Sequence, residues 1–208
     1  MEIVLGIAVL IFSVICHEVA HGLVAERLGD PTARIAGRLT LNPVPHIDLF
    51  GSVLLPAICL ISGTGILFGW AKPVPVDARF LPDPRKDLAK VALAGPATNI
   101  ALAVAFAALF RIGLATGLSP APAMALFATG VTINVVLAVF NLLPIPPLDG
   151  AKVLAGVVGG DFARQLYALE RYGILIIAAL LLAGGLDFVG PVVAAVARAL
   201  TGAGPVHL

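Results

Sequence analysis

The chain has 208 residues, of which 60% are hydrophobic and only 12% are charged, and its formal net charge is +1. This composition leaves too little polar surface to cover a soluble globule, so we expect an integral membrane protein in contact with the lipid bilayer. A nucleic-acid partner is excluded, because the few lysines and arginines are scattered and leave no basic excess. Cys16 and Cys59 both lie in apolar stretches and predict no disulfide framework.

The first predicted element is a transmembrane helix over residues 3–27. It is long enough to cross a bilayer, and it ends where Glu26-Arg27 is followed by Gly29-Asp30-Pro31, a strong helix stop. We expect this helix to be retained, since the N-terminus has no basic region and no small-residue cleavage site typical of a signal peptide.

A His-Glu-x-x-His sequence, residues 17–21, lies inside this first helix. Residues four apart share a helix face, so His17 and His21 can bind one metal ion with Glu18 beside it. Ionisable groups at membrane depth are costly and usually functional, although a polar cluster satisfied between helices is the alternative. A catalytic zinc has three protein ligands and an open position for water, so a third ligand is predicted elsewhere in the chain.

Residues 34–42 are predicted to form a short β segment. Leu39 and Leu41 alternate there with polar side chains, which is the period of a strand. Such a strand can pair with an unwound substrate by adding it at its edge.

Residues 47–69 are apolar but interrupted by glycines and a proline, so they form either an additional span or a re-entrant or interfacial hairpin near the active site. We favour the hairpin, because it lets the helix with His17 and the helix before Asp149 run in the same direction. It also places most basic residues on one side, which is then cytoplasmic. That side contains Arg27, Arg34, Arg38, Lys72, Arg79, Arg85, Lys86, Lys90, Lys152, Arg164 and Arg171, with Arg111 near the other side.

The rest of the chain predicts further membrane helices. They cover residues 87–114, residues 121–143 with a broken continuation at 148–158, and a Gly-rich terminal hairpin at 173–200. No segment of these 208 residues is predicted to form a PDZ or CBS domain. We therefore expect a single domain over residues 1–208, an all-α polytopic membrane protein whose helical transmembrane bundle carries the short β segment and the hairpin.

Asp149 is the candidate third ligand. It follows Pro144, Pro146 and Pro147 in an apolar region, where a broken helix must be buried in protein or line a polar cavity. A position at the start of the restarted helix favours its ionised form, and a simple helix cap is the alternative role.

Three motifs together resemble the site-2 protease family of intramembrane zinc metalloproteases. They are His17-Glu18-x-x-His21, Gly95-Pro96-x-x-Asn99, and Asn141-x-x-Pro144 leading to Leu148-Asp149-Gly150. Residues 69–76 also resemble a stretch typical of small bacterial and archaeal members.

The resemblance implies one zinc ion per chain held by His17, His21 and Asp149, with Glu18 as general base and acid. It implies hydrolysis of peptide bonds within or near the transmembrane segment of a substrate protein, in regulated intramembrane proteolysis. Ala20 and Leu49 stand where many members have Gly and Pro, and neither change removes a ligand.

Three further residues are candidates for binding substrate or supporting the site. Asn141 and Asn99 either contact the substrate or make hydrogen bonds within the helix bundle, and for Asn141 we favour substrate or oxyanion contact. His46 either lines the site or is a turn residue. Asn134 is expected to join helices.

The sequence is consistent with two classes of function. The first is a zinc metalloendopeptidase in the cell membrane, multi-pass, with its active site nearer the cytoplasmic face and possibly homo-oligomeric. The second is a membrane protein that binds or transports zinc without catalysis. Glu18 favours the enzyme, because a transporter needs no base beside the histidine pair.

Overall fold

The structure is a computed structural model that describes residues 2–54, 57–58, 61, 69–117 and 120–202. Its α-helices are α1 (Glu2–Arg27), α2 (Thr32–Ile35), α4 (Pro84–Thr116), α5 (Ala121–Asn141), α6 (Asp149–Val158), α7 (Gly160–Leu169), α8 (Gly173–Leu182) and α9 (Val189–Thr201). Short 3₁₀ turns lie at Val44–His46, Ala78–Phe80 and Glu170–Tyr172, and a π-helical segment at Leu49–Leu54. The predicted all-helical architecture is confirmed for these described ranges.

Within the described ranges, four helices are long and apolar enough to cross a membrane. They are Val4–Arg27, Pro84–Thr116, Ala121–Asn141 and Gly160–Leu182, the last formed by α7, the turn after it and α8. The shorter helix α9 is also apolar. The chain is therefore a multi-pass membrane protein, as its composition predicts.

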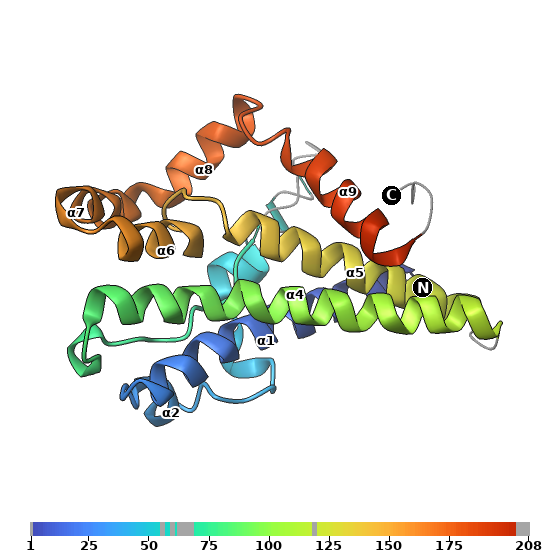
Figure 1. The fold of residues 1–208 in the computed structure, drawn as a ribbon, viewed down its shortest axis with the longest axis horizontal. Helices are drawn as coiled ribbons and strands as arrows, with labels where there is room; N and C mark the ends of the chain where they lie inside the picture. Colours follow the sequence, from blue (N-terminus) through green and yellow to red (C-terminus); the bar gives the residue numbers. More distant parts are fainter. Residues whose placement is uncertain (1, 55–56, 59–60, 62–68, 118–119, 203–208) are drawn as a thin grey trace.

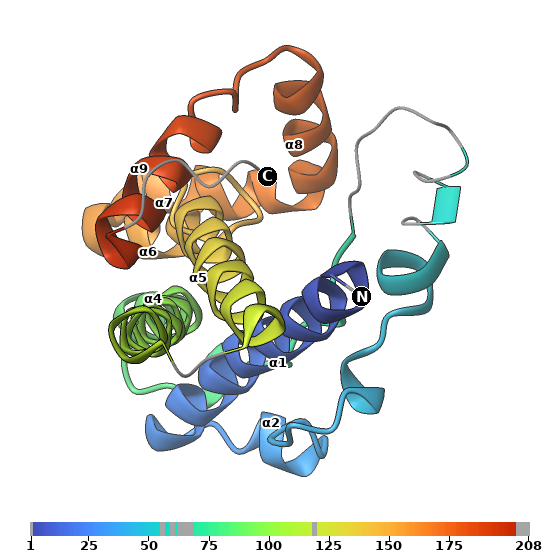
Figure 2. The ribbon, with the colours of Figure 1, turned by 90° about the vertical axis from the view of Figure 1, so that its right-hand side faces the viewer.

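Helices α1, α4 and α5 form the central bundle, and α9 packs on α5 and α4. Figure 1 shows that α1 and α5 run in the same direction while α4 runs the opposite way, and Figure 2 shows the three helices nearly end-on or obliquely. A buried cluster joins α4, α5 and α9 through small side chains, namely Ala103, Ala107, Val131, Val135 and Val193. Small residues let membrane helices approach closely, where van der Waals contact holds them together.

The ends of α4 are fixed by local sequence. At its start, Asp83 accepts a hydrogen bond from the backbone N–H of Lys86 at 3.2 Å, and Pro84 occupies the first helical position. At its end, Gly117 adopts the left-handed conformation with φ of 64°, which a residue with a side chain rarely adopts. The helix thus begins three residues before the predicted span at 87–114.

The chain turns tightly between α5 and α6. A Cβ atom at Gly150 would lie 2.3 Å from the backbone oxygens of Leu142 and Leu143, so only glycine permits this packing. Farther along α6, a Cβ at Gly156 would lie 2.3 Å from the Cβ of Ala89 in α4. These two close approaches place Asp149, the first residue of α6, against the central bundle.

The predicted β segment at 34–42 is wrong. Residues 34 and 35 belong to α2, which begins where Asp30 Oδ1 accepts a hydrogen bond from the backbone N–H of Thr32. Gly37 then turns the chain with a φ of 65°. The alternation of Leu39 and Leu41 marks no strand face, because Leu39 packs against α1 while Leu41 is exposed. Because no strand forms at residues 34–42, the predicted pairing of a substrate with the edge of this segment has no basis either.

The predicted hairpin at 47–69 finds no support in the part of it that the structure describes. Leu49–Leu54 is a π-helical segment, and residues 55–56, 59–60 and 62–68 lie outside the described residues. The parallel course of α1 and α5, which prompted the hairpin hypothesis, is nevertheless present (Figure 1).

Candidate metal centre

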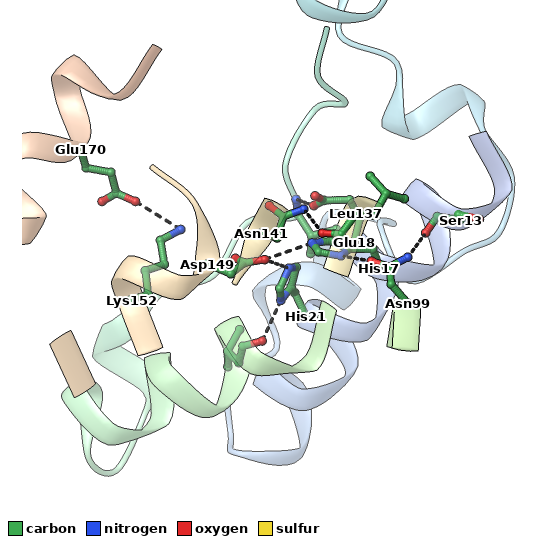
Figure 3. Close-up of polar contacts among 12 residues, drawn as sticks. Ser13, His17, Glu18, His21, Asn99, Leu137, Asn141, Asp149, Lys152 and Glu170 are labelled. Atoms are coloured by element: carbon green, nitrogen blue, oxygen red, sulfur yellow. Dashed lines mark hydrogen bonds and ion pairs between the residues drawn. The ribbon is translucent and has the colours of Figure 1, made fainter. Parts of the chain in front are cut away.

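Three buried side chains from two separate helices converge on one point. His17 and His21 are one turn apart on α1, with ring centroids 4.6 Å apart. Asp149 Oδ2 lies 3.1 Å from His17 Nε2 and 3.3 Å from His21 Nε2. Figure 3 shows both imidazoles directed at this carboxylate. A tetrahedral zinc with bonds of about 2.0–2.1 Å separates its ligand atoms by about 3.3 Å, so these spacings fit the ion.

The other nitrogen of each imidazole is already engaged. His17 Nδ1 lies 2.6 Å from Asn99 Oδ1, and His21 Nδ1 lies 2.7 Å from the carbonyl oxygen of Val91. Both oxygens are acceptors, so each Nδ1 carries the hydrogen and each neutral ring presents the lone pair of Nε2. Two such lone pairs face Asp149 Oδ2, which makes no hydrogen bond of its own. The two nitrogen lone pairs and the carboxylate oxygen repel one another, and a bound cation would relieve this repulsion because all three atoms could act as its ligands.

Gly95 provides the space that the two histidine rings occupy. A Cβ atom at this position of α4 would lie 2.5 Å from His17 Nε2 and 2.5 Å from His21 Nε2. Contacts that short do not occur between nonbonded atoms, so any side chain at residue 95 would displace the rings. Gly95 therefore has a direct role in forming the centre.

A buried polar network holds His17 in place. Asn99 Nδ2 donates to Asn134 Oδ1 at 2.9 Å, and Asn134 Nδ2 donates to Ser13 Oγ at 2.9 Å. Asn99, Asn134 and Ser13 are each 0% exposed. The network links α1, α4 and α5, and it holds the Asn99 amide with its oxygen, not its nitrogen, toward His17. Each amide is thus a positioning group for the metal ligand.

Glu18 is held beside the centre by the extended segment 70–77. Its Oε2 accepts a hydrogen bond from the backbone N–H of Val74 at 2.8 Å. Pro73 and Pro75 flank Val74 and have no N–H, and the rigid φ of proline keeps this part of the chain extended. The segment is tied at both sides of Val74, through the backbone N–H of Lys72 to His46 and the backbone N–H of Asp77 to Asp30.

Asn141 and His46 lie outside the group of ligand atoms. Asn141 Nδ2 donates to the carbonyl oxygen of Leu137 in its own helix at 3.0 Å. His46 is buried in its 3₁₀ turn, where its Nε2 lies 2.9 Å from the carbonyl oxygen of Thr40. Among the described residues, the group that could hold a metal ion consists of His17, His21 and Asp149. The structure thus places His46 as a turn residue, while substrate contact by Asn141 stays a prediction.

The sequence analysis predicted no role for Ser13 or for the backbone carbonyl of Val91. A signal for Ser13 existed, since it lies four residues before His17 and therefore on the same face of α1. Asn134 was assigned only to joining helices, and it does join α4 and α5 through Asn99. The Val91 carbonyl carries no side-chain signal, and only the packing of α4 against α1 reveals it.

Replacing Asn99 with leucine should weaken metal binding by roughly 10- to 100-fold, the usual cost of removing a partner that orients a histidine ligand. Asn134→Leu should have a smaller effect, because it acts only through Asn99. The measurement is zinc affinity by chelator competition on purified protein. Thr132→Val is the matched control, since Thr132 bonds only within α5 and lies outside the network. Equal affinity in Asn99→Leu and Thr132→Val would contradict the assignment.

Comparison with known proteins identifies the family. The profile of peptidase family M50 matches residues 5–119 and 117–184. A Bacillus subtilis (strain 168) protein named "Putative zinc metalloprotease YwhC" is 39% identical over 175 residues, covering 80% of this chain and 75% of that protein. "Putative zinc metalloprotease Rip2" of Mycolicibacterium smegmatis is 34% identical over 191 residues, covering 88% and 69%.

No solved structure matches the chain. The family profile covers well over half of it, and the relatives are similar across most of both chains. The resemblance drawn from the three sequence motifs is thereby confirmed. The chain belongs to peptidase family M50, the site-2 protease family.

Proposed function

We propose that the protein is a zinc-dependent intramembrane endopeptidase that hydrolyses peptide bonds within or near transmembrane segments of substrate proteins. The observation that carries this proposal is the convergence of His17, His21 and Asp149, all buried, with Glu18 on the same helix beside them. The names of the relatives, which describe zinc metalloproteases, support zinc as the ion.

The donor set fits the chemistry of zinc. Two imidazole nitrogens and one carboxylate oxygen form a three-ligand set that leaves a fourth position for water or substrate. When bound, zinc makes water a stronger nucleophile at neutral pH and polarises the scissile carbonyl.

Glu18 performs the proton transfers in this proposal. Its carboxylate accepts the proton of the attacking water and then donates it to the leaving amine. The N–H of Val74 fixes one carboxylate oxygen by a 2.8 Å hydrogen bond, so the second oxygen is left for the proton. A base held in this way loses little orientational freedom when the reaction begins.

The setting of the centre supports substrates that lie in the membrane. The ligands sit on α1 and α6, between helices that are apolar enough to span a bilayer. The peptide bonds of a substrate helix are shielded by their own hydrogen bonds, so the substrate must unwind locally before attack. We place this reaction in regulated intramembrane proteolysis, near the face that we predict to be cytoplasmic.

Metal removal tests the proposal. Purified protein in liposomes is given a panel of model transmembrane peptides before and after treatment with a zinc chelator. We expect cleavage to cease when the ion is removed and to return with about one zinc per chain. Cleavage that persists in metal-free protein would refute the proposal, and bound zinc without cleavage of any peptide would favour a zinc-binding role.

Two histidine variants serve as a matched pair in the same experiment. His21→Gln should lose the ion, because it removes a ligand atom. His46→Gln should retain it, because His46 is an equally buried histidine outside the ligand group.

A further inference from the structure

Arg38 is a buried cation without an anionic partner in the described part of the chain. It is only 5% exposed, and its Nη2 donates to the carbonyl oxygen of Lys72 at 2.5 Å. Its Nε is buried and has no hydrogen-bond partner among the described residues. Buried charges are normally paired, because removing them from water is unfavourable. The unpaired guanidinium therefore indicates that an anion belongs beside it.

A cavity of about 420 Å³ lies next to this guanidinium. It is lined by Ala36, Arg38, Pro45, Lys72, Pro73 and Pro75. No acidic residue is part of this lining, and the exposed ammonium group of Lys72 forms no ion pair with any described carboxylate. Two cations with several free donors thus face a space that can hold a phosphate group.

The cavity lies at the end of the first membrane span. Leu39, the residue after Arg38, packs against α1 at Gly22, where a Cβ atom would lie 2.6 Å from Leu39 Cδ2. Arg38 therefore sits beside the last turns of α1, which ends at Arg27. Figure 2 shows the chain after α2 running along the side of α1 that faces away from α4 and α5.

Exposed apolar side chains adjoin the cavity on the segment that includes Pro45. They are Leu41, Val44, Ile47, Leu49 and Phe50, each more than half exposed. A patch of this kind next to basic residues is typical of protein surfaces at the boundary between lipid tails and headgroups. An acidic peptide would match the charge of the cavity, but it would leave this apolar patch in water.

We propose that this cavity binds the phosphate group of a membrane lipid, with Arg38 and Lys72 as its donors and the apolar patch in contact with the acyl chains. The inference rests on the membrane setting and does not require the proposed protease activity. Pro73 and Pro75 line the cavity on either side of Val74, whose N–H holds Glu18. A bound lipid therefore contacts the segment that orients Glu18.

Native mass spectrometry of the full chain tests the proposal. The protein is kept in dodecyl maltoside, which contains no phosphate, and is titrated with dimyristoyl phosphatidylglycerol. We expect saturable binding that weakens by roughly 10- to 100-fold in Arg38→Gln and in Lys72→Gln, the loss typical of a hydrogen bond to a charged group. Lys72 is exposed, so its variant keeps the test valid even if Arg38→Gln fails to fold.

Arg79→Gln is the matched control. It makes the same change of charge on a nearby exposed residue, but Arg79 pairs with Asp77 at 2.5 Å. Hydrogen bonding from Arg79 lowers the pKa of Asp77 to about 2, so that carboxylate stays ionised and the pair is already balanced. We expect lipid binding by Arg79→Gln to equal that of the native chain.

Three outcomes would overturn the proposal. One is equal lipid affinity in Lys72→Gln and Arg79→Gln. Another is that dimyristoylglycerol, which has the same tails without phosphate, binds as tightly as the phospholipid. The third is that inorganic phosphate or an acidic peptide binds more tightly than the lipid, which would assign the cavity to a free anion or to a peptide.

Discussion

Replacing Glu18 with glutamine should lower the rate of peptide hydrolysis by roughly 100- to 10,000-fold, the usual contribution of a positioned acid–base group. Glutamine has nearly the same shape, and its carbonyl oxygen can still accept the hydrogen bond from Val74. The variant therefore changes the proton-transfer group and leaves segment 70–77 in place. Glu18 is not among the converging ligand atoms, so zinc content should stay at the native value.

The measurement is the single-turnover rate for a model transmembrane peptide in liposomes, with the zinc content of both proteins determined in parallel. A lower rate with unchanged zinc supports the role of Glu18 as the base. Native activity in Glu18→Gln would remove Glu18 from the mechanism. Loss of zinc in this variant would instead make Glu18 part of the ligand set.

The convergence of the candidate metal ligands was predictable from the sequence because their signal is local. His17 and His21 have the spacing of one helix turn, and a helix on that segment puts them together whatever surrounds it. Asp149 was predictable for a different reason, since three prolines before it break a helix in apolar sequence. A carboxylate is unfavourable in such a region, so its presence there indicates a functional role. The structure brings these three residues together as expected.

The β segment failed because its pattern was too short to exclude a turn. Leu39 and Leu41 alternate with polar residues, but Asp30 binds the backbone N–H of Thr32 and starts a helical turn just before them. Gly37, with its positive φ, then reverses the chain. The Asp30 turn and a single glycine therefore outweighed an alternation that covers only a few residues.

The hydrogen bonds that support His17 could not be predicted from the sequence, because they join segments that are far apart in the chain. The hydrogen bond of His17 to Asn99 spans 82 positions, and that of Asn134 to Ser13 spans 121. Periodicity places each amide on a helix face, but only the packing of α1, α4 and α5 shows that they form one chain of hydrogen bonds. The same holds for Gly95, which the sequence showed only as part of a motif and whose contact with the two histidine rings depends on the packing of α4 against α1.

Gly95→Ala should weaken the affinity for zinc by about 100-fold or more, so that the protein binds no zinc at physiological zinc concentrations. A loss of this size is at or above the upper end of the range found when groups that support a metal ligand are disturbed. The added methyl group would lie 2.5 Å from the Nε2 atoms of both histidines, so the rings would have to move away from their present positions. The peptidase activity should disappear together with the ion. Since alanine favours helix over glycine by about 1 kcal/mol, α4 itself should not be weakened by the change.

Gly6→Ala is the matched control for this prediction. It makes the same substitution in α1, where the new Cβ would meet only Thr129 Cγ2, at an ordinary 3.9 Å. We expect it to bind zinc and cleave substrate as the native chain does, so that any difference between the variants reflects the location of the methyl group. Circular dichroism of both variants separates metal loss from unfolding. Native zinc affinity in a folded Gly95→Ala protein would show that the histidine rings do not pack against residue 95, and the geometry of the centre would then need revision.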